Sequence, residues 1–298
     1  MARIVSATRT LVAVLASLGL WHAGPALADG LLWQVRDRDG AVCGHLFGTL
    51  HLCDRGCFPL PQSVLSAFDE AGMLVLELDP QAPGLGEALS AAGRLPPGQR
   101  LDRLLPAGDA DRLAQALEVV GIDPSPMQGM RPWLAGTVLA VAAASRAGFD
   151  ARFGVEPWLA ERARKRGIGL VPLETVERQI AALSGSGLAA QVESLRQTVD
   201  MIIDDEVRDY FERIRDAWRT GDADALLSLM NEGADPSLMA PMTEAVIHRR
   251  NREMADRIAG FGCGPSPYFA AVGGAHFGGE FSLVRELERA GRVVVQIP

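Results

Sequence analysis

The sequence has 298 residues, a mass of 31.8 kDa, 48% hydrophobic and 22% charged residues, and a formal net charge of −8 at pH 7. These values are typical of a globular protein, and the length predicts one large domain or two closely packed lobes. The acidic balance excludes a nucleic-acid partner, because phosphate binding needs a basic surface.

The N-terminus has the layout of a secretory signal peptide. Two arginines precede an apolar run over residues 11–20, and small residues at 26–28 suit a cleavage site. We therefore predict a signal peptide at 1–28 and a domain at 29–298. A membrane anchor is the alternative, but a spanning helix needs about 20 apolar residues, more than this run offers. The mature protein is expected in the bacterial periplasm or secreted, without stable membrane insertion.

The predicted elements describe an α/β fold. A turn with the pair Asp39-Gly40, which is typical of a hairpin, joins the first two strands. In chain order, the pattern predicts strands over 31–36 and 42–50, a helix over 62–71, a strand over 73–79, helices over 109–120, 131–147 and 154–166, a strand over 168–173, a helix over 176–183, three or four helices over 188–258, a strand over 268–276, a helix over 281–290 and a strand over 292–297. This order predicts a mixed sheet with flanking helices and a large helical insert between the N-terminal and C-terminal strand segments.

The predicted export affects the expected state of the four cysteines. In an oxidising compartment they are expected to pair, and four cysteines allow three connectivities. Cys53 and Cys57 flank a tight loop just after His51, which a local disulfide would hold in place. Two alternatives remain open: a metal site formed by His51 and the two thiolates, or four reduced and buried cysteines.

Polar residues follow the predicted strands at their carboxyl ends. His51, Glu174 and His276 each end or follow an apolar run, and Glu77 and Asp79 end another. Ligands of open α/β sheets collect at this edge, where side chains point into a crevice. We therefore expect these ends to lie close together.

Two of these strand ends share the pattern G-x-x-H, at Gly48 to His51 and at Gly273 to His276. The pattern also occurs within the predicted signal peptide, so it needs structural context. Each glycine would let the backbone approach a neighbour or a ligand closely. The alternative for either histidine alone is a structural hydrogen bond.

Glu77 lies within the apolar run 74–78. A carboxylate is costly to bury as an anion without a partner, so a cation should lie opposite. That cation is either an arginine in a salt bridge or a metal. Two imidazoles and a carboxylate form a ligand set for a catalytic divalent ion, with positions left for water and substrate.

Five segments together resemble the TraB/GumN family. They are G-T-x-H within 46–51, V-L-E-L-D at 75–79, L-E-T-V-E-x-Q at 173–179, R-N-x-x-M-A at 250–255 and A-V-G-G-A-H at 271–276. The resemblance implies an active centre at the two G-x-x-H motifs and a glutamate, which here are Gly48/His51, Gly273/His276 and Glu77. The family is related to the Tiki metalloproteases, which implies metal-dependent peptide hydrolysis, and more distantly to erythromycin esterase-like and haem-binding ChaN-like proteins.

Roles for the individual residues follow as hypotheses. His51 and His276 would hold a divalent ion (manganese, cobalt or zinc), and Glu77 would complete the ligand set or act as general base. Asp79, Glu174, Arg250 and Asn251 would lie around this centre, and the guanidinium would suit a carbonyl oxygen that becomes negative. The alternatives are a helix-terminal carboxylate for Glu174 and a solvated helix face for Arg250.

The sequence thus favours an exported metal-dependent hydrolase of a peptide or small-molecule substrate. A haem- or small-ligand-binding protein without turnover is the alternative, since histidine is a common haem ligand. The third hypothesis is an inactive accessory protein of the cell envelope.

Overall fold

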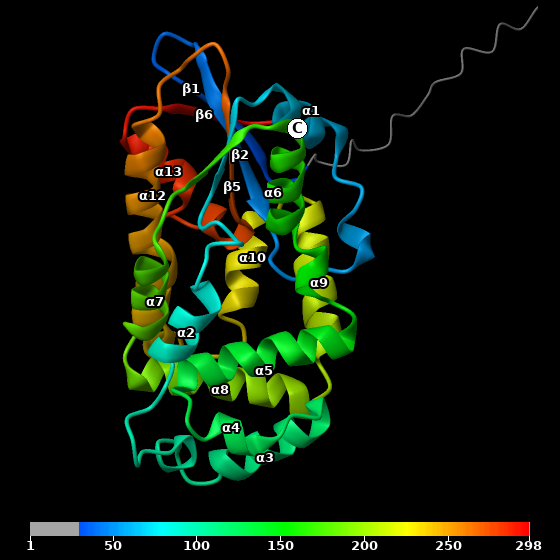
Figure 1. Ribbon diagram of the computed structural model, residues 1–298, viewed down its shortest axis with the longest axis vertical. Helices are drawn as coiled ribbons and strands as arrows, with labels where there is room; N and C mark the ends of the chain where they lie inside the picture. The colour runs from blue at the N-terminus through cyan, green and yellow to red at the C-terminus, as the bar shows by residue number, and fades with distance from the viewer. Residues whose placement is uncertain (1–29, 298) are drawn as a thin grey trace, which may run out of the picture.

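The computed structural model describes residues 30–297, so the predicted signal peptide lies outside the described residues. A six-stranded sheet forms one end of the molecule, with the strand order β4-β3-β5-β2-β1-β6 (Figure 1). The strands are β1 (Leu32–Arg36), β2 (Val42–Thr49), β3 (Met73–Leu76), β4 (Gly169–Pro172), β5 (Tyr268–Gly273) and β6 (Val293–Gln296). β2, β3, β4 and β5 run parallel, and β1 pairs antiparallel with β2 and β6. The predicted mixed α/β sheet is confirmed.

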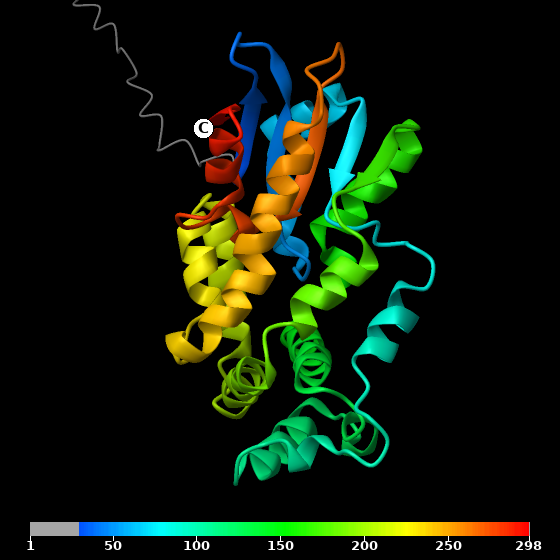
Figure 2. The same ribbon diagram turned by 90° about the vertical axis from the view of Figure 1, so that its left-hand side faces the viewer.

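Helices flank the sheet and fill the chain between β3 and β5, as predicted. They are α1 (Gln62–Glu70), α2 (Leu85–Ala92), α3 (Asp109–Val120), α4 (Pro124–Met127), α5 (Pro132–Ala147), α6 (Val155–Arg166), α7 (Val176–Ser184), α8 (Leu188–Ile203), α9 (Val207–Arg219), α10 (Ala223–Met230), α11 (Pro236–Thr243), α12 (Arg249–Ala259) and α13 (Leu283–Arg289). In both views, α3, α5 and α8 lie at the end of the molecule away from the sheet (Figures 1 and 2). Within residues 30–297, no helix has both the length and the apolar character that crossing a membrane requires.

The sequence did not predict α2 and α4. α2 has no buried residue, so it lacks the apolar stripe by which helices are recognised. α4 is a single turn that contains two prolines. Over residues 188–258 the structure has α8 to α12 and a π-helical turn at Glu244–His248, where the sequence predicts three or four helices.

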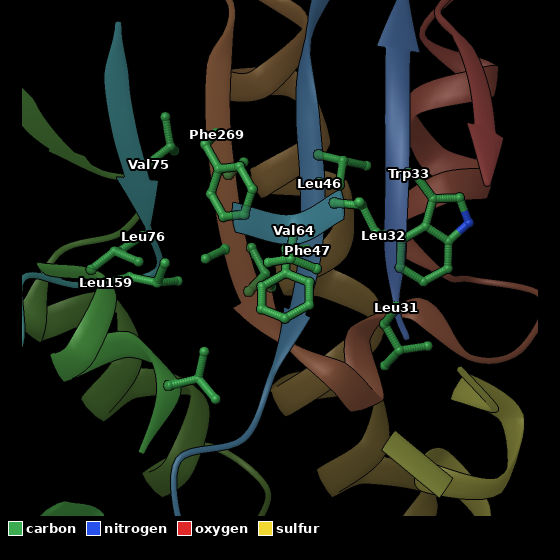
Figure 3. Packing of buried hydrophobic residues seen from close by; sticks show 14 of the residues in the cluster. Leu31, Leu32, Trp33, Leu46, Phe47, Val64, Val75, Leu76, Leu159 and Phe269 are labelled. Carbon is green, nitrogen blue, oxygen red and sulfur yellow. The ribbon is translucent and has the colours of Figure 1, made fainter. Parts of the chain in front are cut away.

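Two separate apolar cores hold these layers together. The larger one lies between the sheet and its helices, and Figure 3 shows Phe47 and Phe269 in it. Phe68 of α1 is fully buried in the same core. The second lies between α3, α5 and α8 and includes Leu117, Leu139 and Leu195. Each fully buried side chain of this kind stabilises the fold by about 1.5–3 kcal/mol. The helical insert therefore has a core of its own.

The three strands that lead to the candidate site residues end earlier than the sequence predicts. β2 ends at Thr49, β3 at Leu76 and β5 at Gly273, so that His51, Glu77 and His276 lie just beyond the ladder. After Gly273 the chain forms a 3₁₀ turn at Gly274–Phe277. Beyond β3 one backbone hydrogen bond continues, from the N–H of Glu174 to the carbonyl of Glu77 at 2.9 Å. An apolar pattern alone does not reveal where the regular pairing ends.

Residues 30–297 contain two disulfides. The disulfide Cys53–Cys57 spans the 3₁₀ turn Arg55–Cys57. The predicted local disulfide is therefore confirmed. The two alternatives, a thiolate metal site and four reduced cysteines, are wrong. Cys43–Cys263 joins β2 to the loop before β5. Such bonds are consistent with an extracytoplasmic location.

Replacing Cys43 and Cys263 together by serine should lower the free energy of unfolding by about 2–5 kcal/mol, because the bond closes a long loop in the unfolded chain. Urea unfolding of the oxidised protein and the variant, followed by circular dichroism, measures the difference. An unchanged midpoint would show that the disulfide adds nothing to stability.

Candidate functional site

A cavity of about 460 Å³ lies at the carboxyl edge of the sheet. β3, β5 and β2 are neighbours there, and Thr49 of β2 pairs with Gly273 of β5. Parallel strands therefore bring His51, Glu77 and His276 to one edge, as expected from the sequence, and all three line the cavity.

The guanidinium of Arg250 is the centre of this edge. It comes from α12, is buried, and donates to Glu174 at 2.7–3.0 Å, to the carbonyl of Val246 at 3.0 Å and to a carboxylate oxygen of Glu77. It also lies 3.2 Å from Nε2 of His276. The salt-bridge alternative for Glu77 is thus realised, whereas the solvated-face alternative for Arg250 is wrong.

Charge pairing overcomes the cost of burial in this cluster. Burial by itself would raise the pKa of Glu77, but Arg250 and other nearby groups hold that pKa well below its usual range. Burial would likewise lower the pKa of Arg250, yet Glu77 and Glu174 raise it. The pairing therefore favours the charged form of both groups. All five N–H groups of Arg250 have an acceptor, so its role is to position the residues around it.

Asn251 fixes the orientation of His276. Its side-chain amide donates to the backbone carbonyls of His276 and Phe281 at 3.0 and 2.7 Å, which turns its oxygen toward Nδ1 of His276 at 2.6 Å. Nδ1 therefore carries the proton, and Nε2 accepts from Arg250. Burial, assisted by the charge of Arg250, lowers the pKa of His276 to about 3. His276 is a neutral imidazole.

His51 lies next to a carboxylate, whereas His276 lies next to a guanidinium. Its Nδ1 lies 2.7 Å from the carboxylate of Glu156, which also accepts from the hydroxyl of Thr49 at 2.5 Å. Glu156 raises the pKa of His51 to about 9. The imidazole has 68% of its side-chain surface accessible because it faces the cavity.

Glu156 is the site residue that the sequence did not reveal. It lies in the first turn of α6, where the helix N-terminus stabilises an anion. A glutamate at that position is common in any helix. Its backbone neighbour Val155 donates to Leu50 at 3.0 Å, so that α6 is held against the segment that carries His51.

Gly273 keeps the space between these groups open. Its N–H donates to Glu77 at 2.6 Å. A Cβ atom at this position would lie 3.2 Å from Oε1 of Glu77, 3.6 Å from Nε2 of His51 and 3.6 Å from Cδ2 of His276. A larger residue would therefore fill the space that the three side chains share.

Gly48 has a different role. A Cβ atom there would lie 2.6 Å from the side chain of Leu31, and its carbonyl accepts from the indole of Trp218 at 2.7 Å. Gly48 thus permits close packing of β2 and does not line the cavity. Asp79 also lies away from the cavity, where its carboxylate accepts from the N–H of Gln81 at 2.9 Å in a turn.

Comparison with known proteins agrees with this arrangement of motifs. Residues 31–296 match the TraB/PrgY/gumN family. The chain belongs to this family. It is 25% identical over 257 residues to the uncharacterized protein YbaP of Escherichia coli (strain K12) and to that of Shigella flexneri, which covers 82% of this chain and 87% of either relative. No solved structure matches the sequence.

For a TraB/PrgY/gumN protein the resemblance implies a divalent ion, but the predicted ligands do not fit one as they are arranged here. His276 directs Nε2 at the guanidinium of Arg250, and that cation already neutralises Glu77. In the described part of the chain, only Cys53, Asp54 and Cys57 bring three such ligand atoms within 4.8 Å of one another, and these thiols form a disulfide. The donor types suit a metal, whereas their positions suit the guanidinium.

Replacing Arg250 by alanine should lower the free energy of unfolding by about 3–5 kcal/mol, because Glu77 and Glu174 would remain buried without a cation. Arg252 is a matched control on the same helix, since its ion pair with Glu244 is exposed to solvent and its loss should cost less than about 1 kcal/mol. Equal losses for the two variants in urea unfolding would contradict the central role of Arg250.

Replacing Glu156 by glutamine should lower the pKa of His51 from about 9 toward the ordinary value of 6.5, because the anion that favours the imidazolium is removed. Titration of the histidine ring protons by nuclear magnetic resonance measures this pKa. With Glu156 present, the ion pair stabilises the fold fully below about pH 6.5, and this contribution is lost as the pH rises through about 9. A pKa that does not change in the variant would contradict the pairing.

Proposed function

We propose that this protein is a hydrolase that cleaves an amide or ester bond in the cavity. The observation that supports this most strongly is the His51–Glu156 pair. Nδ1 of His51 is held by a carboxylate, while Nε2 faces the same space as Oε1 of Glu77 above Gly273. An imidazole oriented in this way can exchange protons with a group in the cavity.

The chemistry assigned to these residues is general base catalysis. Nε2 of His51 takes a proton from a water molecule, and Oε1 of Glu77 accepts the second hydrogen of that water and orients it. The hydroxide attacks the carbonyl carbon, and His51 then gives the proton to the leaving nitrogen or oxygen. Arg250 and the N–H of Gly273 hold Glu77 in place, and Asn251 orients His276 against Arg250.

The metal-dependent hydrolase predicted from the sequence is the competing candidate. One observation favours it: Nδ1 of both imidazoles is held by an acceptor, as in histidines whose other nitrogen binds a metal. Bound manganese, cobalt or zinc would lower the pKa of a water molecule. The mechanism proposed above requires only groups of the protein.

Replacing His51 by glutamine should lower kcat/KM by about 100-fold or more, because the base is lost. In the unchanged protein, kcat/KM for a p-nitroanilide should rise about tenfold per pH unit and level off near pH 9, as the imidazole loses its proton. His248, which pairs with Glu244 outside the cavity, gives the control His248→Gln with unchanged activity. A rate that does not depend on pH between 6 and 9 would contradict the role of His51.

Treatment with a chelator separates the candidates. If the protein acts as we propose, it should keep its full hydrolase activity after dialysis against EDTA. Two results together would establish the metal-dependent hydrolase instead. Activity would be lost with EDTA and restored by manganese, cobalt or zinc, and the metal bound to the unchanged protein would be absent from His276→Ala. A Soret band on addition of haem, lost in His51→Ala and without turnover of any anilide, would establish the binding protein.

A further inference from the structure

The cavity has a polar end and an apolar remainder. Among the described residues that line it, the charged groups are His51, Glu77 and Arg250, which lie at the sheet edge beside His276. The other walls come from the helical insert and are mostly apolar. They include Leu183 of α7, Phe211 and Ile214 of α9, Met230 of α10 and Val246 of the π-helical turn.

These walls leave apolar side chains in contact with the cavity rather than with each other. Several apolar side chains that line the cavity are only partly buried, namely those of Phe211, Ile214, Met230 and Val246. Apolar surface of this kind gains free energy when a ligand removes it from water. A volume of about 460 Å³ falls in the range of roughly 300–1,000 Å³ that encloses small ligands.

Charge restricts which ligand can enter the apolar part. Arg250 is paired with both Glu77 and Glu174, and it has no N–H group left to donate. Beyond the sheet edge the polar side chains of the lining are Gln179 and Tyr210, which are uncharged. A charged substituent there would lose its water without gaining a partner of opposite charge, which is unfavourable. The ring of His51, in contrast, faces the cavity and can approach a carbonyl group.

We infer that the cavity binds the uncharged apolar acyl group of an amide or ester, with the carbonyl at His51 and the acyl chain between α7, α9 and α10. The assignment rests on the proposed function and names its substrate class. The polar end holds the bond that is cleaved, and the helical insert selects the acyl group by its size and lack of charge.

Calorimetric titration of the mature protein with N-methyl alkanamides of four, six and eight carbons tests the inference. The affinity should rise about threefold to fourfold for each added methylene group until the chain fills the cavity. An alkanamide of equal length that ends in a carboxylate should bind at least tenfold more weakly. Equal affinities across the series, or equal binding of the charged ligand, would overturn the inference.

Neighbouring alanines on α7 provide a matched pair of variants. Ala182 is buried and lines the cavity, so Ala182→Phe should fill it and weaken binding of the eight-carbon amide at least tenfold. Ala181 is exposed on the same helix, and Ala181→Phe should bind like the unchanged protein. Met230→Trp on α10 tests the same wall if Ala182→Phe does not fold. Unchanged binding in a folded cavity variant would contradict the assignment.

The proposed function and the substrate class can fail separately. Length-dependent binding of the amides without hydrolysis of any ester or anilide would support the apolar cavity and refute the hydrolase. Hydrolysis of acetyl and octanoyl anilides with equal kcat/KM, together with binding that ignores chain length, would support the hydrolase and refute the apolar substrate.

Discussion

The structure of this site depends on one buried cation. Arg250 connects the end of β3 through Glu77, the end of β4 through Glu174, the π-helical turn through Val246 and the turn after β5 through His276. Four segments that are far apart in the sequence meet at one planar group whose donors have fixed directions. An arginine suits this position because its guanidinium is always charged and can bind carboxylates with two hydrogen bonds.

The two imidazoles of the site lie in different electrostatic environments. His276 lies next to Arg250 in a buried position and remains neutral, whereas His51 lies next to Glu156 and takes up a proton readily. Titratable groups whose environments shift their pKa values in opposite directions are a feature of acid–base sites. The family motif thus contains two histidines with different tasks: His276 completes the support of the buried cluster, and His51 faces the cavity.

The sheet and the helical insert supply different walls of the cavity. The sheet edge supplies the polar groups, because parallel strands end there together. The helical insert has its own apolar core and presents a second apolar surface to the cavity. The residues of α9 and α10 that line the cavity take no part in the hydrogen bonds around Arg250.

The sequence by itself determined the mixed sheet, the helical insert and the meeting of His51, Glu77 and His276, because apolar runs of strand length with polar ends carry this information locally. It favoured the local disulfide Cys53–Cys57 but left other pairings and states of the cysteines open. It also required a cation for Glu77. Only the tertiary structure decided that this cation is Arg250, that Glu156 pairs with His51, and that Gly48 serves packing while Gly273 keeps the cavity open. The two charge pairs join residues about 100 or more positions apart, and Glu156 and Arg250 are ordinary helix residues by pattern. Such pairing follows from how the segments pack, and no local periodicity records it.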